Sequence, residues 1–141
     1  MKRISLEQAN AIVAGALAKG REMGLKPLTV VVLDPGSNLI ALQREDNSST
    51  LRPQIAIGKA AGALALGISS RKIGDMAAER ASFVGSLSGI APNGIIPAAG
   101  GVIVVDGGEI VGAVGITGDL SDNDEAAALA GIAAAGLTAQ A

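Results

Sequence analysis

The stretch GVIVVDGGEIVGAVGI, residues 101–116, carries the clearest structural signal in the chain. Two runs rich in Val and Ile flank Asp106-Gly107-Gly108, and Asp-Gly and Gly-Gly pairs favour the tight turns that join antiparallel strands. The pattern therefore predicts a β-hairpin with strands at residues 101–105 and 109–116.

A second hairpin is predicted upstream. The β-branched run at residues 28–33 is followed by the turn sequence DPGSN at 34–38 and by a second extended segment at 39–44. Pro, Gly and Asn between two apolar runs indicate a reversal of the chain. Two hairpins imply an antiparallel sheet.

Helices are predicted in the segments before, between and after these hairpins. Ser5 and Gln8 form a capping-box pattern before a helix at residues 6–23, Thr50 is expected to cap a helix reaching about residue 66, and Ser121 a last helix reaching about Thr138. A shorter helix is expected at about 70–80. Residues 81–97 are predicted to form a loop with one helical turn near 83–87.

The order helix, hairpin, two helices, hairpin, helix indicates the α+β class, with helices packed on an antiparallel sheet. The length of 141 residues fits one domain, 1–141, because no repeat or linker divides the chain. The core must be Val, Ile, Leu and Ala, since the chain has one aromatic residue, Phe83, with 27 Ala and 20 Gly. Backbones must therefore approach closely.

Composition excludes several kinds of chemistry. The chain contains no His and no Cys, which excludes a Ser-His-Asp triad, a Cys nucleophile, a zinc finger and a disulfide. No metal site is predicted, and only hard ions would suit the oxygen ligands present. A net charge of −2 and the lack of aromatic stacking groups argue against nucleic acid. With no apolar signal or membrane span apparent, we expect a cytoplasmic protein.

Charge is divided unevenly along the chain. Residues 1–80 hold all 11 Lys and Arg against 7 acids, whereas residues 81–141 hold 6 acids and no base. The two halves are opposite in sign, which favours contact between them, within one molecule or between copies. The alternative is that these are solvated faces without special pairing.

Few side chains remain as candidates for chemistry. Arg44 can clamp a carboxylate or phosphate, and Asp46 can act as a base or hold Arg44, although both also fit a solvated strand end. Lys59 is the only charge between Arg52 and Arg71 and lies among Ala and Gly, so it either extends to solvent or lines a pocket as an anion-binding group or base.

Backbone amides and acids near the second hairpin complete the candidate set. Gly100-Gly101 can offer amides to an anion or serve a turn, and Asp119 either faces a pocket or belongs to a helix start. The GxxGxxG spacing from Gly112 to Gly118 is not a dinucleotide fingerprint. We expect ligand contacts from Arg52, Lys59, Gly100, Gly101 and Thr117, and, if the protein is an enzyme, catalytic roles for Lys59, Arg44, Asp46 and Asp119.

Several short motifs resemble the GlcG/HbpS family when they are taken together in order and spacing. They are VVVLDPG at 30–36, Leu39-Ile40-Ala41, Arg44-x-Asp46, IAxGKA at 55–60, Gly100-Gly101-Val102-Ile103, IVGAVGITG at 110–118 and Asp122-x-Asp124-Glu125. The likeness covers nearly the whole chain, although no single motif is decisive.

The resemblance implies a profilin-like domain, with a central antiparallel sheet of about five strands flanked by helices, and homo-oligomers from dimer to octamer. Family members are haem-binding or haem-degrading accessory proteins, are similar to the C-terminal domain of PduO-type cobalamin adenosyltransferases, and often belong to catabolic gene clusters. Because the chain lacks His, Cys and Tyr, an axial ligand to haem iron would have to be Met76, Lys59, or a Thr or carboxylate oxygen.

Two functional hypotheses follow from these observations. The first is a small oligomeric protein that binds a small anionic or haem-type ligand and is accessory to a catabolic pathway. The second is a cofactor-independent isomerase, hydratase or lyase acting on a small carboxylated or carbonyl compound, with Arg44 holding the carboxylate and Lys59 as base or electrophile. Convergence of Arg44, Lys59 and Asp119 on one cavity would favour catalysis, and their dispersal on the surface would favour a scaffold or accessory role.

Overall fold

The computed structural model describes residues 2–140 and is built on a five-stranded antiparallel sheet. The strands are β1 (Thr29–Leu33), β2 (Leu39–Arg44), β3 (Gly101–Asp106), β4 (Glu109–Thr117) and β5 (Thr138–Ala139), in the spatial order β2-β1-β4-β3-β5. Both predicted hairpins are present, β1 with β2 and β3 with β4. Pairing of β1 with β4 joins the two hairpins into one sheet.

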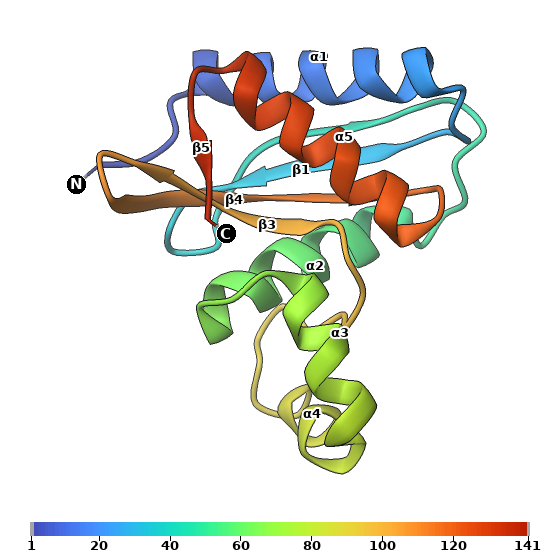
Figure 1. Cartoon of the computed structure of the whole chain (residues 1–141), viewed down its shortest axis with the longest axis vertical. Coiled ribbons are helices and arrows are strands. Elements are labelled where there is room, and N and C mark those ends of the chain that lie inside the picture. Colours follow the sequence, from blue (N-terminus) through green and yellow to red (C-terminus); the bar gives the residue numbers. More distant parts are fainter. Residues whose placement is uncertain (1, 141) are drawn as a thin grey trace.

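Helices cover both faces of this sheet (Figure 1). α1 (Leu6–Met23) and α5 (Ser121–Ala134) lie side by side on one face, and α2 (Arg52–Leu66) crosses the other. Alternation along β1 divides its side chains between the two layers, since Val30 and Val32 pack toward α1 and α5 whereas Val31 and Leu33 pack toward α2. The expected α+β class, with a central antiparallel sheet flanked by helices, is confirmed.

Small residues allow these layers to approach closely, as the composition predicted. A Cβ atom added to Gly131 of α5 would collide with the carbonyl of Ile12 in α1, and one added to Gly115 of β4 would collide with the carbonyl of Ala56 in α2. At these positions the backbone of one element touches the backbone of the next. The Ala and Gly content therefore serves packing on both faces of the sheet.

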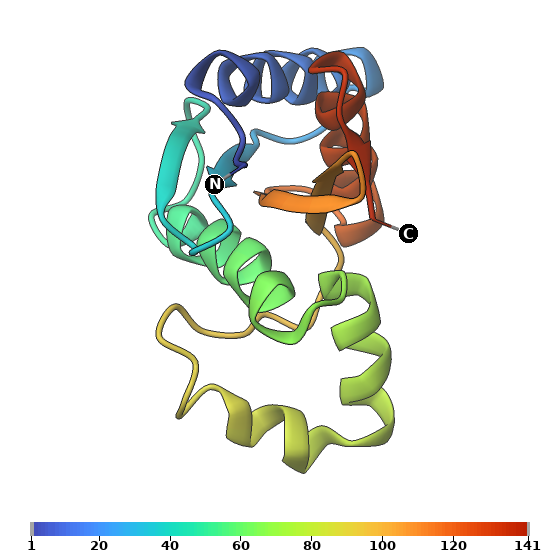
Figure 2. The same ribbon diagram turned by 90° about the vertical axis from the view of Figure 1, so that its left-hand side faces the viewer.

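A smaller lobe projects beyond α2 (Figure 2). It consists of α3 (Ser70–Glu79), α4 (Ala81–Leu87) and the segment 88–97 that returns the chain to β3. A separate apolar cluster of Ile73, Val84 and Ile95, called here the satellite cluster, holds this lobe together. The lobe has its own small core, apart from the two layers against the sheet.

Three local expectations differ from the structure. The segment predicted as a loop with one turn contains α4, a helix of 7 residues. α2 and α5 begin after Leu51 and Leu120, so neither Thr50 nor Ser121 provides the side-chain cap that was expected. α5 ends at Ala134, because Gly136 with φ of 73° reverses the chain and Thr138 then pairs with β3.

No helix within residues 2–140 combines the length and the apolar character that crossing a lipid bilayer requires.

Candidate functional site

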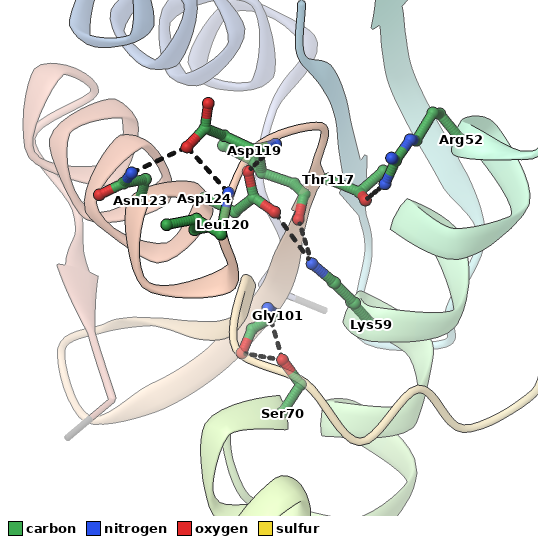
Figure 3. A network of polar contacts seen from close by, with 10 residues as sticks. Arg52, Lys59, Ser70, Gly101, Thr117, Asp119, Leu120, Asn123 and Asp124 are labelled. Carbon is green, nitrogen blue, oxygen red and sulfur yellow. Dashed lines mark hydrogen bonds and ion pairs between the residues drawn. The ribbon is translucent and has the colours of Figure 1, made fainter. Parts of the chain in front are cut away.

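A buried ion pair lies between α2 and the start of α5, at the end of the sheet where β4 finishes (Figure 3). The Lys59 ammonium Nζ donates to the carbonyl of Ile116 at 2.9 Å and to Asp124 Oδ2 at 3.2 Å. The two side chains are only 3% and 1% exposed. Burial lowers the pKa of Lys59 and raises that of Asp124, and their mutual attraction opposes both shifts.

Glycines at the start of β3 make room for this lysine. A Cβ added to Gly100, whose φ is 126°, would lie 2.9 Å from Lys59 Nζ, and one added to Gly101 would collide with the Lys59 carbonyl. The Gly101 amide donates to the Ser70 hydroxyl at 2.6 Å, and that hydroxyl also reaches the Gly101 carbonyl at 3.3 Å. Gly100 and Gly101 therefore allow close packing around Lys59.

Asp119 fixes the loop between β4 and α5. Its carboxylate accepts hydrogen bonds from the amides of Lys26 and Leu120 and from the Asn123 side chain, at 2.8 to 2.9 Å. These bonds, the one from Asn123 first, lower the pKa of Asp119 to about 2. The Asp119 amide donates to Asp124 Oδ1 at 2.9 Å. Asp119 thus orients the carboxylate that Lys59 binds, while its own carboxylate bonds to other groups.

Arg52 covers the end of β4 from the first turn of α2. Its Nη1 donates to Thr117 Oγ1 at 2.8 Å, and its Nε donates to Ser49 Oγ at 3.2 Å. Thr117 is buried, with 1% of its surface exposed. Within residues 2–140 the structure shows no carboxylate within 4 Å of the Arg52 guanidinium. Arg52 and Lys59 also repel each other, which further lowers the Lys59 pKa.

Arg44 and Asp46 lie at the same end of the sheet but on its outer edge. Together with Leu25, Pro27 and Glu45 they line an open groove of about 420 Å³. Lys59 and Asp119 are absent from its lining. Convergence of Arg44, Lys59 and Asp119 on one cavity would favour catalysis. Only Arg44 lines this groove, so the three side chains do not share it.

The structure therefore brings together Lys59, Arg52, Thr117, Gly100 and Gly101, and it places Arg44 and Asp46 at the margin. Sequence reasoning missed the roles of Asp124, Ser70 and Thr29. The isolation of Lys59 among small residues was a usable signal for Asp124, since a buried ammonium requires a carboxylate partner. Nothing in the local sequence singles out Thr29 or Ser70.

A larger groove, of about 620 Å³, lies at the opposite end of β2. Lys2, Arg3, Leu6, Asp34 and Leu39 are among its lining residues. Lys2 is already paired with Asp106 at 3.5 Å. None of the groove's lining side chains has a buried polar atom without a partner. Its volume makes this groove a candidate ligand site. The buried hydroxyls without a hydrogen-bond partner, those of Thr29 and Ser48, instead favour a ligand site at the end of the sheet near Arg52.

The residues present do not fit a ligated haem iron. The chain has no imidazole, thiol or phenol. Met76 packs against the satellite cluster, and the Lys59 ammonium is enclosed in its pair with Asp124. Haem iron prefers nitrogen, thiolate, thioether or phenolate ligands, and neither Met76 nor Lys59 lines either groove. Cationic side chains suited to carboxylate groups are present instead.

The fold and this site define an α+β protein whose five-stranded antiparallel sheet lies between a helix pair and a single helix, with a buried Lys-Asp pair at one end. The family model "Haem degrading protein HbpS-like" matches residues 4–133. The chain therefore belongs to the HbpS-like family, as its motifs predicted.

Known proteins agree with this assignment. A 15.0 kDa protein from the dhaT-dhaS intergenic region of Citrobacter freundii is 30% identical over 121 residues, 86% of this chain and 84% of that protein. Klebsiella pneumoniae ORFY superposes with a TM-score of 0.87 at 25% identity, covering 96% of this chain and 92% of that one. The PduOC:heme complex gives 0.87 at 19% identity, over 99% of each chain, which shows a shared fold.

Proposed function

We propose that this protein binds a small anionic or haem-type ligand as a homo-oligomer, accessory to a catabolic pathway. The observation that carries the proposal is the presence of two cations, Arg52 and Lys59, where α2 meets the end of β4. Arg52 and Lys59 lie close enough to repel each other, and Asp124 is the one carboxylate bonded to either of them among the described residues. A guanidinium that has no carboxylate partner in the described part of the chain and lies beside a second cation favours an anionic ligand.

The residues predicted from the sequence take different parts in this proposal. Arg52 contacts the ligand first, because its guanidinium is partly exposed and has no carboxylate partner within residues 2–140, and the buried Thr117 contacts the ligand once Arg52 leaves its hydroxyl. Lys59, Gly100 and Gly101 support the site by fixing the end of β4 against α2. Arg44 and Asp46 approach from the neighbouring groove.

Relatives extend the proposal to tetrapyrroles. The family is named for haem degradation, and a structure with the same fold was obtained as a haem complex. In this chain the propionate groups of such a ligand are the part that its residues can hold, since basic side chains are present and a strong iron ligand is not. Binding is therefore expected to depend little on the metal.

The alternative, a cofactor-independent isomerase, hydratase or lyase, requires substrate to reach Lys59. That side chain is 3% exposed, and its donors are directed at Asp124 and the Ile116 carbonyl. Arg44 and Asp119 have separate surroundings. These contacts favour binding over turnover.

Calorimetric titration of the wild-type protein tests the proposal, with hemin, metal-free protoporphyrin IX and malonate as probes. We expect saturable binding of at least one probe, and similar affinities for hemin and protoporphyrin IX. Absence of saturable binding for all three would refute the binding function. Light scattering tests the assembly: a monomer at the titration concentration would refute the oligomeric part alone.

A further inference from the structure

A row of polar side chains crosses three strands at the end of the sheet. Arg44 of β2 is the register partner of Thr29 in β1, and Thr29 is the register partner of Thr117 in β4. Directly paired residues of antiparallel strands project from the same face of a sheet. That face is the one covered by α2, since Arg52 of α2 donates to Thr117 Oγ1. Arg44 and Arg52 therefore flank two threonine hydroxyls.

One hydroxyl of this row has no hydrogen-bond partner. Thr29 is fully buried, and its Oγ1 is unsatisfied. The Ser48 hydroxyl, next to the Arg52 partner Ser49, is the other such side-chain atom among residues 2–140. A buried polar group without a partner costs about 1–3 kcal/mol, so native proteins contain few of them. Thr29 is paired with Thr117 in the sheet and Ser48 precedes Ser49 in the sequence, and Thr117 and Ser49 are the two hydrogen-bond partners of the Arg52 side chain.

The charges around the row point the same way. Neither Arg44 nor Arg52 lies within 4 Å of a carboxylate in the described part of the chain, whereas Arg71 is held by both Asp122 and Glu125. α2 begins at Arg52, and its N-cap, Leu51, offers no side-chain acceptor to the first-turn amides. Arg44 of β2 and Arg52, at the positive end of the 15-residue helix α2, thus lie on the two elements that contact β1, the strand of the unsatisfied hydroxyl.

We propose that Arg44, Thr29, Thr117 and Arg52 form a carboxylate-binding subsite. The subsite rests on the proposed function and specifies where and by which groups the anion is held. Thr29 and Thr117 are buried beneath Arg52, so the proposed binding includes a movement of the Arg52 side chain away from Thr117. The carboxylate then replaces Thr117 Oγ1 as the acceptor for Arg52 and accepts the hydroxyl proton of Thr29, which has no acceptor in the free protein. The carboxylate comes either from a free small acid or from the propionate edge of a tetrapyrrole.

Four variants test the subsite with malonate and metal-free protoporphyrin IX as separate probes. Arg52→Gln and Thr29→Val alter it. Arg3→Gln in the 620 Å³ groove and Thr50→Val in an exposed loop position are the matched controls. We expect each of the first two to weaken binding by at least about tenfold and the controls to stay within about twofold of wild type. A response to malonate identifies the free-acid source, and a response to the porphyrin identifies the propionate source.

A second measurement separates a binding role of Thr29 from a structural one. Because its hydroxyl is unsatisfied in the free protein, Thr29→Val should leave the ligand-free Tm equal to or above that of wild type, while the rise in Tm on adding the probe is lost. Unchanged affinity in Thr29→Val and Arg52→Gln, with wild type still binding, would overturn the subsite and leave the proposed function standing. Absence of binding to wild type would overturn both.

Discussion

At the scale of single residues, the Lys59–Asp124 pair is the feature on which the end of the sheet depends. Both charges are almost fully buried and each has a second hydrogen bond, Lys59 to the Ile116 carbonyl and Asp124 from the Asp119 amide. A buried pair adds little net stability, because desolvation offsets the attraction, but removing one partner strands the other charge. The pair therefore enforces the joint placement of α2, β4 and α5.

Mutation of the pair gives a prediction at this scale. Lys59→Met and Asp124→Asn should each destabilise the protein by about 3–5 kcal/mol, because each leaves the remaining partner without its counter-charge. The double variant should cost clearly less than the sum of the two. Urea unfolding of the three variants and wild type measures this coupling. Additive effects would show that the two side chains do not act as a pair.

At the scale of elements, the starts of the helices show which local signals hold. Ser5 forms the full capping box with Gln8, its hydroxyl accepting from the Gln8 amide at 3.0 Å and its own amide donating to Oε1 of Gln8 at 2.9 Å. Thr50 resembles Ser5 as a candidate cap, yet the Arg52 guanidinium is tied to Ser49 and Thr117, and α2 begins one residue later than Thr50 would require. The later start of α2 thus goes together with the hydrogen bonds that its first residue, Arg52, makes to Ser49 and Thr117.

The two positions form a matched test. Ser5→Ala should lower the free energy of unfolding by about 1 kcal/mol, because the Gln8 amide loses its acceptor. Thr50→Ala, at an exposed residue that caps nothing, should change it by less than about 0.5 kcal/mol. Thermal or urea unfolding of both variants measures the difference. Equal losses would mean that the Ser5 box contributes no more than an exposed loop hydroxyl.

At the scale of the whole molecule, the uneven charge of the sequence is largely resolved by pairing between its two halves. Lys2 binds Asp106, Lys59 binds Asp124, and Arg71 binds both Asp122 and Glu125. Bases from the first 80 residues thus meet four of the six acids of the remainder. These pairs agree with the first of the two interpretations of the sequence, which is contact between the halves. Arg44 and Arg52 of the proposed subsite take no part in the pairing.

The molecule also divides into two unequal cores, which predicts unequal stability. Val84→Ala in the satellite cluster should cost about 1–3 kcal/mol locally and speed amide exchange across residues 70–97, with little effect on β1 and β4. Val104 belongs to the core between the sheet and the helices α1 and α5, and Val104→Ala should speed amide exchange throughout the sheet. Hydrogen exchange followed by mass spectrometry compares the two. Identical exchange patterns would show that the lobe and the sheet unfold as one unit.

Hydrophobic periodicity and turn residues act over short distances, so the class of fold, both hairpins, the helices α1, α2 and α3, and the family could all be predicted from the sequence. It also singled out Lys59, since an isolated charge among Ala and Gly is visible locally. Only the tertiary structure decided that Asp124 is its partner, 65 residues away, that Thr138–Ala139 completes the sheet, and that Thr29 is left with an unsatisfied hydroxyl. These facts depend on which strands and helices meet, and local sequence does not encode the partner of a buried polar group.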